Sequence, residues 1–263
     1  MTDFNRHGLS RYVPSEIRLA VRQRCGFGCV CCGAGFYDYE HFDPDFKDAT
    51  QHKAESITLL CMQCNQKKRR GLLSVETVRL ANSNPRCLQQ MFSSEAFDFS
   101  HEAPIEVVFA GQTFVDCKTL IEINELPLLA VAPPVTHGQP YRLSGYFADS
   151  GGELTLKIEE NVWTAGDHNW DIEWEGQRVT IRSGPRDISL VLKHEPPHRL
   201  IIERLNMEAD GILLRGKEDL LEVALDGIHW NQWSGCHTGR GLVGMSFANQ
   251  PRRRTVSSLL NQT

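Results

Sequence analysis

The sequence lacks the features that would place the chain in a membrane or export it from the cell. No apolar run approaches the roughly 20 residues that a membrane-spanning helix needs, and residues 1–6 lack the apolar stretch of a secretory signal peptide. Neither charge nor aromatic content departs from that of ordinary globular proteins. We therefore expect a folded cytoplasmic protein with no membrane association.

Several catalytic signatures are also missing. Residues 105–263 contain no nucleophile elbow, no glycine-rich phosphate loop and no second metal pattern. A fixed-period repeat is absent too, which argues against a solenoid. Any chemistry must therefore be sought in the first third of the chain.

Cysteine, in contrast, is concentrated. Six of the nine cysteines fall within forty residues, at positions 25, 29, 31, 32, 61 and 64. A secreted disulfide framework would spread its cysteines and carry a secretory signal. Clustered Cys-x-x-Cys pairs in a chain without such a signal favour zinc.

Two pairs have the spacing of metal ligands. Cys29 and Cys32, followed by Gly33, predict a knuckle in which two thiolates converge on one ion. Cys61 and Cys64 lie three apart at the start of a predicted helix and so share one face. Four thiolates close a tetrahedral structural zinc site.

Other readings of the cysteines stay open. Cys25 and Cys31 are spare, and Cys31 could replace Cys29 or Cys32, although the spacing favours the named pair. Four free buried thiols, or a zinc ribbon without catalysis, are the alternatives to a catalytic zinc-clamped module.

The chain divides into two parts by pattern. Helices are predicted over residues 15–25, 60–70 and 74–82, with a short strand over 37–42. Residues 93–104 show little periodicity and are predicted to be a linker between domains at 1–92 and 105–263. From residue 105 onward, short β-type runs separated by turns predict an all-β, sandwich-like domain, and the tail from Arg252 is expected to be loose.

Charge follows the same division. Residues 1–91 hold thirteen Lys and Arg against nine Asp and Glu, whereas the remainder holds fifteen against twenty-four. We interpret this as a basic part that meets polyanions, joined to an acidic part that does not. The acidic part suits a regulatory protein surface that acts through self-association or a protein partner. Trp230 and Trp233 are read mainly as core, with a ligand surface as the alternative.

The strongest functional pattern lies between the two cysteine pairs. Glu40-His41 precedes the run from Leu60 to Lys68, which reads Leu-Cys-Met-Gln-Cys-Asn-Gln-Lys-Lys and places Asn65 directly after Cys64. This combination resembles the HNH endonucleases, the ββα-metal nucleases that include colicin DNases. The resemblance covers roughly residues 14–85, about a third of the chain.

The resemblance implies an α+β chain whose first domain is an HNH endonuclease that hydrolyses phosphodiester bonds, with DNA favoured over RNA. His41 would be the general base, and Glu40 and Asn65 would bind one Mg²⁺, with Mn²⁺ or Ni²⁺ as alternatives. The family's middle asparagine falls at Ser56, so either Ser56 or His52 would take the orienting role. The rival function is a non-catalytic, zinc-dependent nucleic-acid-binding or interaction module.

A basic run closes the pattern. Lys67, Lys68, Arg69 and Arg70 predict a strip that contacts phosphates without reading bases. Arginines on the first predicted helix, at positions 18, 22 and 24, could extend that strip.

Overall fold

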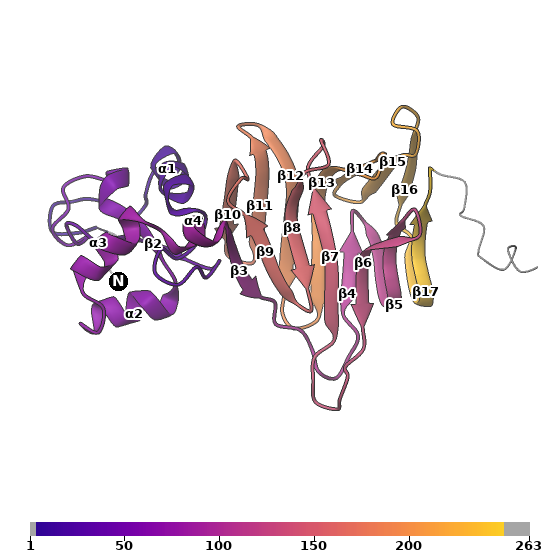
Figure 1. Cartoon of the computed structure of the whole chain (residues 1–263), viewed down its shortest axis with the longest axis horizontal. Coiled ribbons are helices and arrows are strands. Elements are labelled where there is room, and N and C mark those ends of the chain that lie inside the picture. Colours follow the sequence, from indigo (N-terminus) through magenta and orange to yellow (C-terminus); the bar gives the residue numbers. More distant parts are fainter. Residues whose placement is uncertain (1–3, 250–263) are drawn as a thin grey trace, which may run out of the picture.

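The structure is a computed structural model that describes residues 4–249. A helical part at the amino-terminal end joins a large β-sheet coiled into a half-barrel, so the fold is mixed (Figure 1). The tail from Arg252, expected to be loose, lies outside the described residues. Among residues 4–249, no helix combines the length and the apolar character needed to cross a membrane.

The helical part contains four helices and one β-hairpin. Its elements are α1 (Ser15–Cys25), β1 (Asp38–His41), a 3₁₀ turn (Ala54–Ser56), β2 (Ile57–Leu60), α2 (Met62–Arg69), α3 (Val75–Ser83) and α4 (Arg86–Gln90). β1 and β2 are antiparallel, with Glu40 opposite Thr58 and His41 opposite Ile57. Only Cys61 separates the end of the hairpin from the start of α2, so the hairpin and α2 form a ββα unit.

Local chemistry explains where the helices begin and end. α1 stops at Gly26, whose φ of 70° is left-handed and costs glycine little. The Sγ of Cys61 accepts a hydrogen bond from the backbone of Cys64 and caps α2. Ser74 caps α3 in the same manner, through the backbone N–H of Thr77.

The half-barrel is one continuous sheet of fifteen strands. They are β3 (Phe92–Ala96), β4 (Glu106–Phe109), β5 (Gln112–Ile123), β6 (Leu126–Ala132), β7 (Arg142–Ala148), β8 (Leu154–Glu159), β9 (Val162–Gly166), β10 (Asp171–Glu175), β11 (Arg178–Gly184), β12 (Asp187–Glu195), β13 (Arg199–Ala209), β14 (Ile212–Lys217), β15 (Leu220–Ala224), β16 (Trp230–Ser234) and β17 (His237–Phe247). The main path is β10-β11-β12-β13-β4-β5-β6-β7-β8-β9-β3, with β14 to β16 continuing from β13 and β17 joined to β5.

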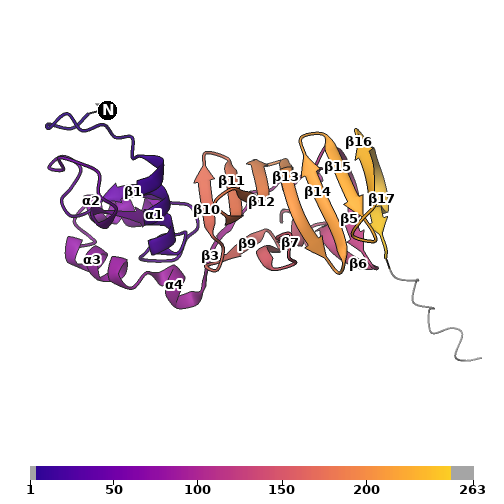
Figure 2. The same ribbon diagram turned by 90° about the horizontal axis from the view of Figure 1, so that it is seen from above.

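One large hydrophobic core fills the inside of the half-barrel. Burial alternates along β13, where Leu200, Ile202, Leu205 and Met207 are buried, as expected for strands with one face turned inward. Figure 2 shows β10 to β15 on one side of the half-barrel and β5, β6, β7 and β9 on the other. The helical part has its own smaller core around α1, β2 and α3.

Several details differ from the sequence-based expectations. The strands form one coiled sheet rather than two separate sandwich layers. Phe92–Ala96, which overlaps the expected linker, is a strand that pairs with β9. Its sequence shows no alternation of apolar and polar residues, because the strand is held by backbone hydrogen bonds to β9 rather than by a buried apolar face. The helix expected from Leu60 starts at Met62, since Leu60 is the last residue of β2. The proposed domain boundaries stay predictions.

Buried charges join the two parts. The guanidinium of Arg22 makes two hydrogen bonds to the carboxylate of Asp171, at 2.7 and 2.8 Å, and one to Glu173 at 2.9 Å. It also donates to the hydroxyl of Tyr39 at 2.6 Å, and Arg182 approaches Asp171 to 2.8 Å. The side chains of Arg22 and Asp171 are almost completely buried. Helix α1 and strand β1 are therefore tied directly to β10.

A second connection runs through the loop after Cys32. Gly35 donates a backbone hydrogen bond to Ser94 on β3, and a Cβ at Gly35 would lie 2.0 Å from the ring of Trp163. Phe36 packs edge-on against Trp163 and Trp174, with ring centroids 6.1 and 4.4 Å away. Glycine at position 35 therefore allows the loop to lie flat against a buried tryptophan.

Candidate functional site

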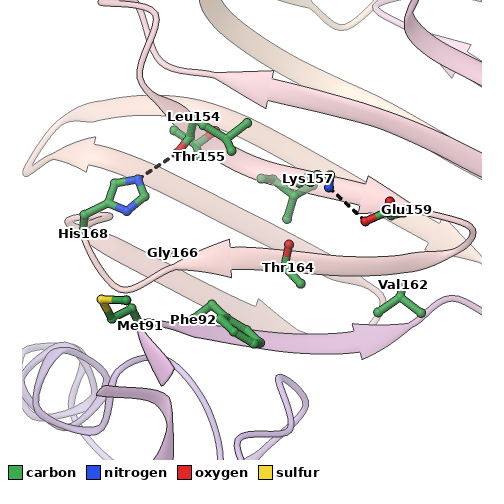
Figure 3. Close-up of a pocket in the computed structure, with 11 residues that line it drawn as sticks. Met91, Phe92, Leu154, Thr155, Lys157, Glu159, Val162, Thr164, Gly166 and His168 are labelled. Carbon is green, nitrogen blue, oxygen red and sulfur yellow. Dashed lines mark hydrogen bonds and ion pairs between the residues drawn. The ribbon is translucent and has the colours of Figure 1, made fainter. Parts of the chain in front are cut away.

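A groove of about 460 Å³ lies along β8, β9 and β3 (Figure 3). The charged groups in its lining already have partners: Lys157 pairs with Glu159, and Nε2 of His168 is bonded to the carbonyl oxygen of Leu154. The rest of the lining is largely apolar. This groove offers no cluster of groups suited to catalysis, and the candidate chemistry lies in the helical part.

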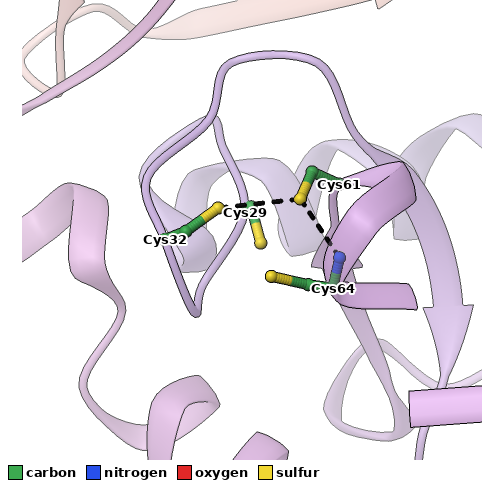
Figure 4. A group of neighbouring side chains, drawn as sticks. All are labelled: Cys29, Cys32, Cys61 and Cys64. Carbon is green, nitrogen blue, oxygen red and sulfur yellow. Dashed lines mark hydrogen bonds between the residues drawn. The ribbon is translucent and has the colours of Figure 1, made fainter. Parts of the chain in front are cut away.

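The four cysteines expected to form a clamp do converge (Figure 4). Four Sγ atoms lie within 4.8 Å of one another, those of Cys29, Cys32, Cys61 and Cys64. The first pair comes from a knuckle in which Gly33 has a φ of 84° and donates to the carbonyl oxygen of Cys29 at 2.8 Å. The second pair comes from the first turn of α2.

The geometry of the cluster suits a tetrahedral metal ion. Sulfur ligands at about 2.3 Å from zinc would lie roughly 3.8 Å from each other, and the Sγ atoms of Cys32 and Cys61 are 3.6 Å apart. Three of the four cysteines are buried, and Cys32 lies at the surface. The four cysteines could therefore hold a structural metal ion such as zinc.

Neighbouring thiols and burial shift the pKa values of the cluster in opposite directions. Hydrogen bonds from Cys31 and Cys32 hold the pKa of Cys29 well below its usual range. Burial raises the pKa of Cys64 to about 12. The cluster thus stabilises one thiolate and resists a second, and a cation at its centre would favour ionisation of all four. Cys25 lies apart, with its thiol 3.9 Å from Thr58.

Glu40 and Asn65 meet between β1 and α2. The side-chain amide of Asn65 donates to Glu40 at 3.4 Å, while its oxygen, Oδ1, is buried without a hydrogen-bond partner among residues 4–249. The ammonium of Lys68 lies 3.1 Å from Glu40, 3.2 Å from the carbonyl oxygen of His41 and 2.8 Å from Asp45. Three side chains with oxygen atoms of the kind that hard divalent ions prefer, those of Glu40, Asp45 and Asn65, therefore lie in this region.

His41 and His52 form a short relay. Nε2 of His41 lies 3.0 Å from Nδ1 of His52, and Nε2 of His52 lies 3.0 Å from the carbonyl oxygen of Ser10. Because that carbonyl can only accept, the proton of His52 must be on Nε2, and Nδ1 is the acceptor for His41. The lone pair of His41 is then on Nδ1, which is buried and has no hydrogen-bond partner among the described residues.

The surroundings of His41 keep it neutral. Burial, with the nearby His52 and Lys68, lowers the pKa of His41 to about 4. A histidine in this state at neutral pH has a free lone pair and can accept a proton. The centre of the His41 ring also lies 5.7 Å from that of the Phe46 ring.

An open cleft of about 370 Å³ adjoins Glu40 and Asn65, and we call it the Glu40 cleft. Its lining is formed by Arg11, Tyr12, Val13, Arg18, Asp38, Tyr39, Glu40, Asn65 and Arg69. Three arginines against two carboxylates give it a positive charge. Arg11 and Tyr12 carried no recognisable signal in the sequence, because only the fold brings the segment before α1 beside β1.

The basic residues are placed differently from the single strip expected. Lys67, Arg69 and Arg70 are exposed at the end of α2, whereas the side chain of Lys68 is only 8% exposed and points at Glu40 and Asp45. Of the α1 arginines, Arg18 lines the Glu40 cleft. The other two point inward, since Arg22 binds Asp171 and Arg24 donates to the carbonyl oxygens of Ala54 and Ile57.

Of the two residues considered for the middle asparagine, His52 lies against His41. Ser56 contacts this region through its backbone, where its carbonyl oxygen accepts from the N–H of Phe42 at 3.1 Å. The comparisons with known proteins add no further guide: no family model, curated protein or solved structure matches the chain significantly.

Proposed function

We propose that the chain is a metal-dependent endonuclease of the HNH type that hydrolyses phosphodiester bonds of DNA. The observation that carries the proposal is the ββα unit itself. Its strand β1 carries Glu40 and His41 as neighbours, and its helix α2 sets the side chain of Asn65 against that of Glu40. The two cysteine pairs lie before and after Glu40-His41 in the sequence, and Asn65 directly follows the second pair. An acid, a neutral imidazole and a side-chain amide carried by one ββα unit are the groups that such hydrolysis requires.

His41 is the general base of this proposal. His52 donates to Ser10 and accepts from His41, so it fixes which nitrogen of His41 carries the lone pair. The attacking water would then lose its proton to Nδ1 of His41. His52 acts through His41 and is a positioning residue.

Glu40 and Asn65 are the residues that would hold a divalent ion, Mg²⁺ or Mn²⁺. The Oδ1 of Asn65 has no hydrogen-bond partner among residues 4–249, and the carboxylate of Glu40 lies 3.4 Å from the Nδ2 of the same side chain. Both groups offer oxygen ligands of the kind that such an ion takes. When bound, the ion supplies charge stabilisation at the scissile phosphate and at the leaving oxygen. Arg69, exposed beside these two residues, would contact a neighbouring phosphate.

One observation favours the rival, a non-catalytic zinc-dependent nucleic-acid-binding module. The ammonium of Lys68 already neutralises Glu40 and Asp45, at 3.1 and 2.8 Å. If that ion pair persists, a divalent ion gains little at this position. The arginines of the Glu40 cleft would then bind phosphates without cleaving them.

Plasmid cleavage separates the two functions. Supercoiled DNA is incubated with the wild type, with His41→Ala and with His229→Ala, each with and without Mg²⁺ or Mn²⁺. His229 is an exposed histidine of the β half and serves as the matched control. We expect metal-dependent nicking by the wild type and by His229→Ala, and a loss of roughly 10²- to 10⁴-fold in His41→Ala. Equal DNA binding and no cleavage by all three proteins would instead support the rival.

A further inference from the structure

We propose that the Glu40 cleft binds an unpaired nucleotide, so that the substrate is single-stranded nucleic acid next to the bond to be cut. The inference rests on the proposed function, because it names the substrate class of the same site. It starts from Tyr12, whose side chain is 65% exposed at the rim of the cleft. Proteins that bind single-stranded nucleic acid commonly stack a base on an exposed aromatic ring that lies beside arginines.

The position of Tyr12 is fixed rather than incidental. Its backbone N–H donates to the hydroxyl of Ser10 at 3.1 Å, and the carbonyl oxygen of Ser10 anchors His52. The guanidinium of Arg18 lies 5.6 Å from the centre of the Tyr12 ring. The stacking surface is therefore two residues away from the anchor of the histidine relay.

Two residues that line the cleft also carry polar atoms that lack hydrogen-bond partners. Nε of Arg18 is buried and has no hydrogen-bond partner among residues 4–249, and the same holds for Oδ1 of Asn65. One is a cationic donor suited to a phosphate oxygen, and the other is an acceptor. The Arg18 guanidinium also lies 3.9 Å from the carboxylate of Glu173. A donor and an acceptor that lack hydrogen-bond partners, on two residues that line one cleft, suit a ligand with phosphate and polar groups, which a nucleotide provides.

The chemistry favours an unpaired base over a duplex. In a duplex the faces of each base are covered by its neighbours, and an exposed ring such as that of Tyr12 has no base face to cover. In a single strand the base can turn onto the ring while its phosphate meets Arg18 or Arg69. The positive charge of the cleft serves both forms, so the ring is what discriminates between them.

Binding is measured with full-length His41→Ala and no added divalent ion, so that cleavage does not interfere. The probes are a fluorescein-labelled single-stranded oligonucleotide and the same sequence as a duplex, followed by anisotropy. Adding Tyr12→Ala should raise the Kd for the single strand by about 5- to 150-fold and change duplex binding little. Tyr12→Phe should retain single-strand binding.

Phe4→Ala is the matched control, since Phe4 is an exposed aromatic residue of the same part but does not line the cleft. Unchanged single-strand affinity in Tyr12→Ala, or an equal loss on both probes, would overturn the inference. The outcome is separable from that of the proposed function. If single-strand binding depends on Tyr12 but the wild type cleaves no DNA, the proposed nuclease activity alone is refuted. If the wild type cleaves DNA and Tyr12→Ala does so equally well, the proposed nucleotide-binding site alone is refuted.

Discussion

Replacing Asp171 by alanine tests how firmly the β-sheet holds the helical part. The substitution removes two of the four hydrogen bonds that the Arg22 guanidinium makes, at 2.7 and 2.8 Å, in a site where both side chains are at most 4% exposed. Breaking a buried pair on one side costs about 3–5 kcal/mol, because a charge is left without its partner. Arg22 keeps Glu173 and Tyr39, so we expect a loss of about 3 kcal/mol.

Urea unfolding followed by tryptophan fluorescence measures this loss, since Trp170 and Trp174 flank the substitution. The matched control is Glu203→Ala, which removes the Arg178 pair at the surface and should cost well under about 1 kcal/mol. A double variant, Arg22→Met with Asp171→Leu, should be less destabilised than Asp171→Ala because the two most deeply buried charges are removed together, and the partly exposed Arg182 and Glu173 still pair with each other. If Asp171→Ala were no more destabilising than Glu203→Ala, the network would not be a buried one, and the reasoning would fail.

Two further outcomes are expected. Protein purified without chelators should contain about one zinc per chain by elemental analysis. Cys61→Ser should lose both the zinc and thermal stability, while Cys236→Ser, at an exposed cysteine, should keep both. A wild type that melts at the same temperature with and without zinc would contradict the clamp. Burial lowers the pKa of His194, so the folded state resists protonation of this side chain. The contribution of neutral His194 to the free energy of unfolding is therefore complete above the unfolded pKa of about 6.5 and is lost as the pH falls below that value. His194→Gln should therefore lose less stability than the wild type between about pH 7.5 and pH 5.5, measured by urea unfolding at both pH values; equal losses would refute this origin.

Local spacing was enough to predict the cysteine cluster. Cys29 and Cys32 belong to one turn and Cys61 and Cys64 to one helical turn, so each pair is fixed by its own segment. The only long-range step is the meeting of the two pairs, and a shared metal ion would favour it. The convergence of the four thiols is confirmed on that basis.

Contacts between distant segments could not be predicted in this way. The sequence groups Arg22 with the other arginines of the first helix, because nothing local indicates its partner Asp171, which lies 149 positions further along the chain. Lys68 was placed on an outer strip, since helix periodicity cannot tell which lysine of a basic run turns towards a carboxylate. The half-barrel depends on parallel strand pairs such as β13 with β4. These strands lie far apart in the sequence, so no local pattern predicts that they pair.

The connection between the two parts bears on what the acidic half does. Tyr39 precedes Glu40 on β1, and its hydroxyl is held by Arg22, which Asp171 and Glu173 hold in turn. The knuckle is held as well, through the backbone bond from Gly35 to β3. Both the strand that carries the proposed acid and base and the loop that carries half of the cysteine cluster therefore rest on the β-sheet. A partner that bound the acidic half and displaced β10 would act on Glu40 through two hydrogen-bonded contacts, from β10 to Arg22 and from Arg22 to Tyr39, and one peptide bond. The regulatory role predicted for this half therefore has a physical route.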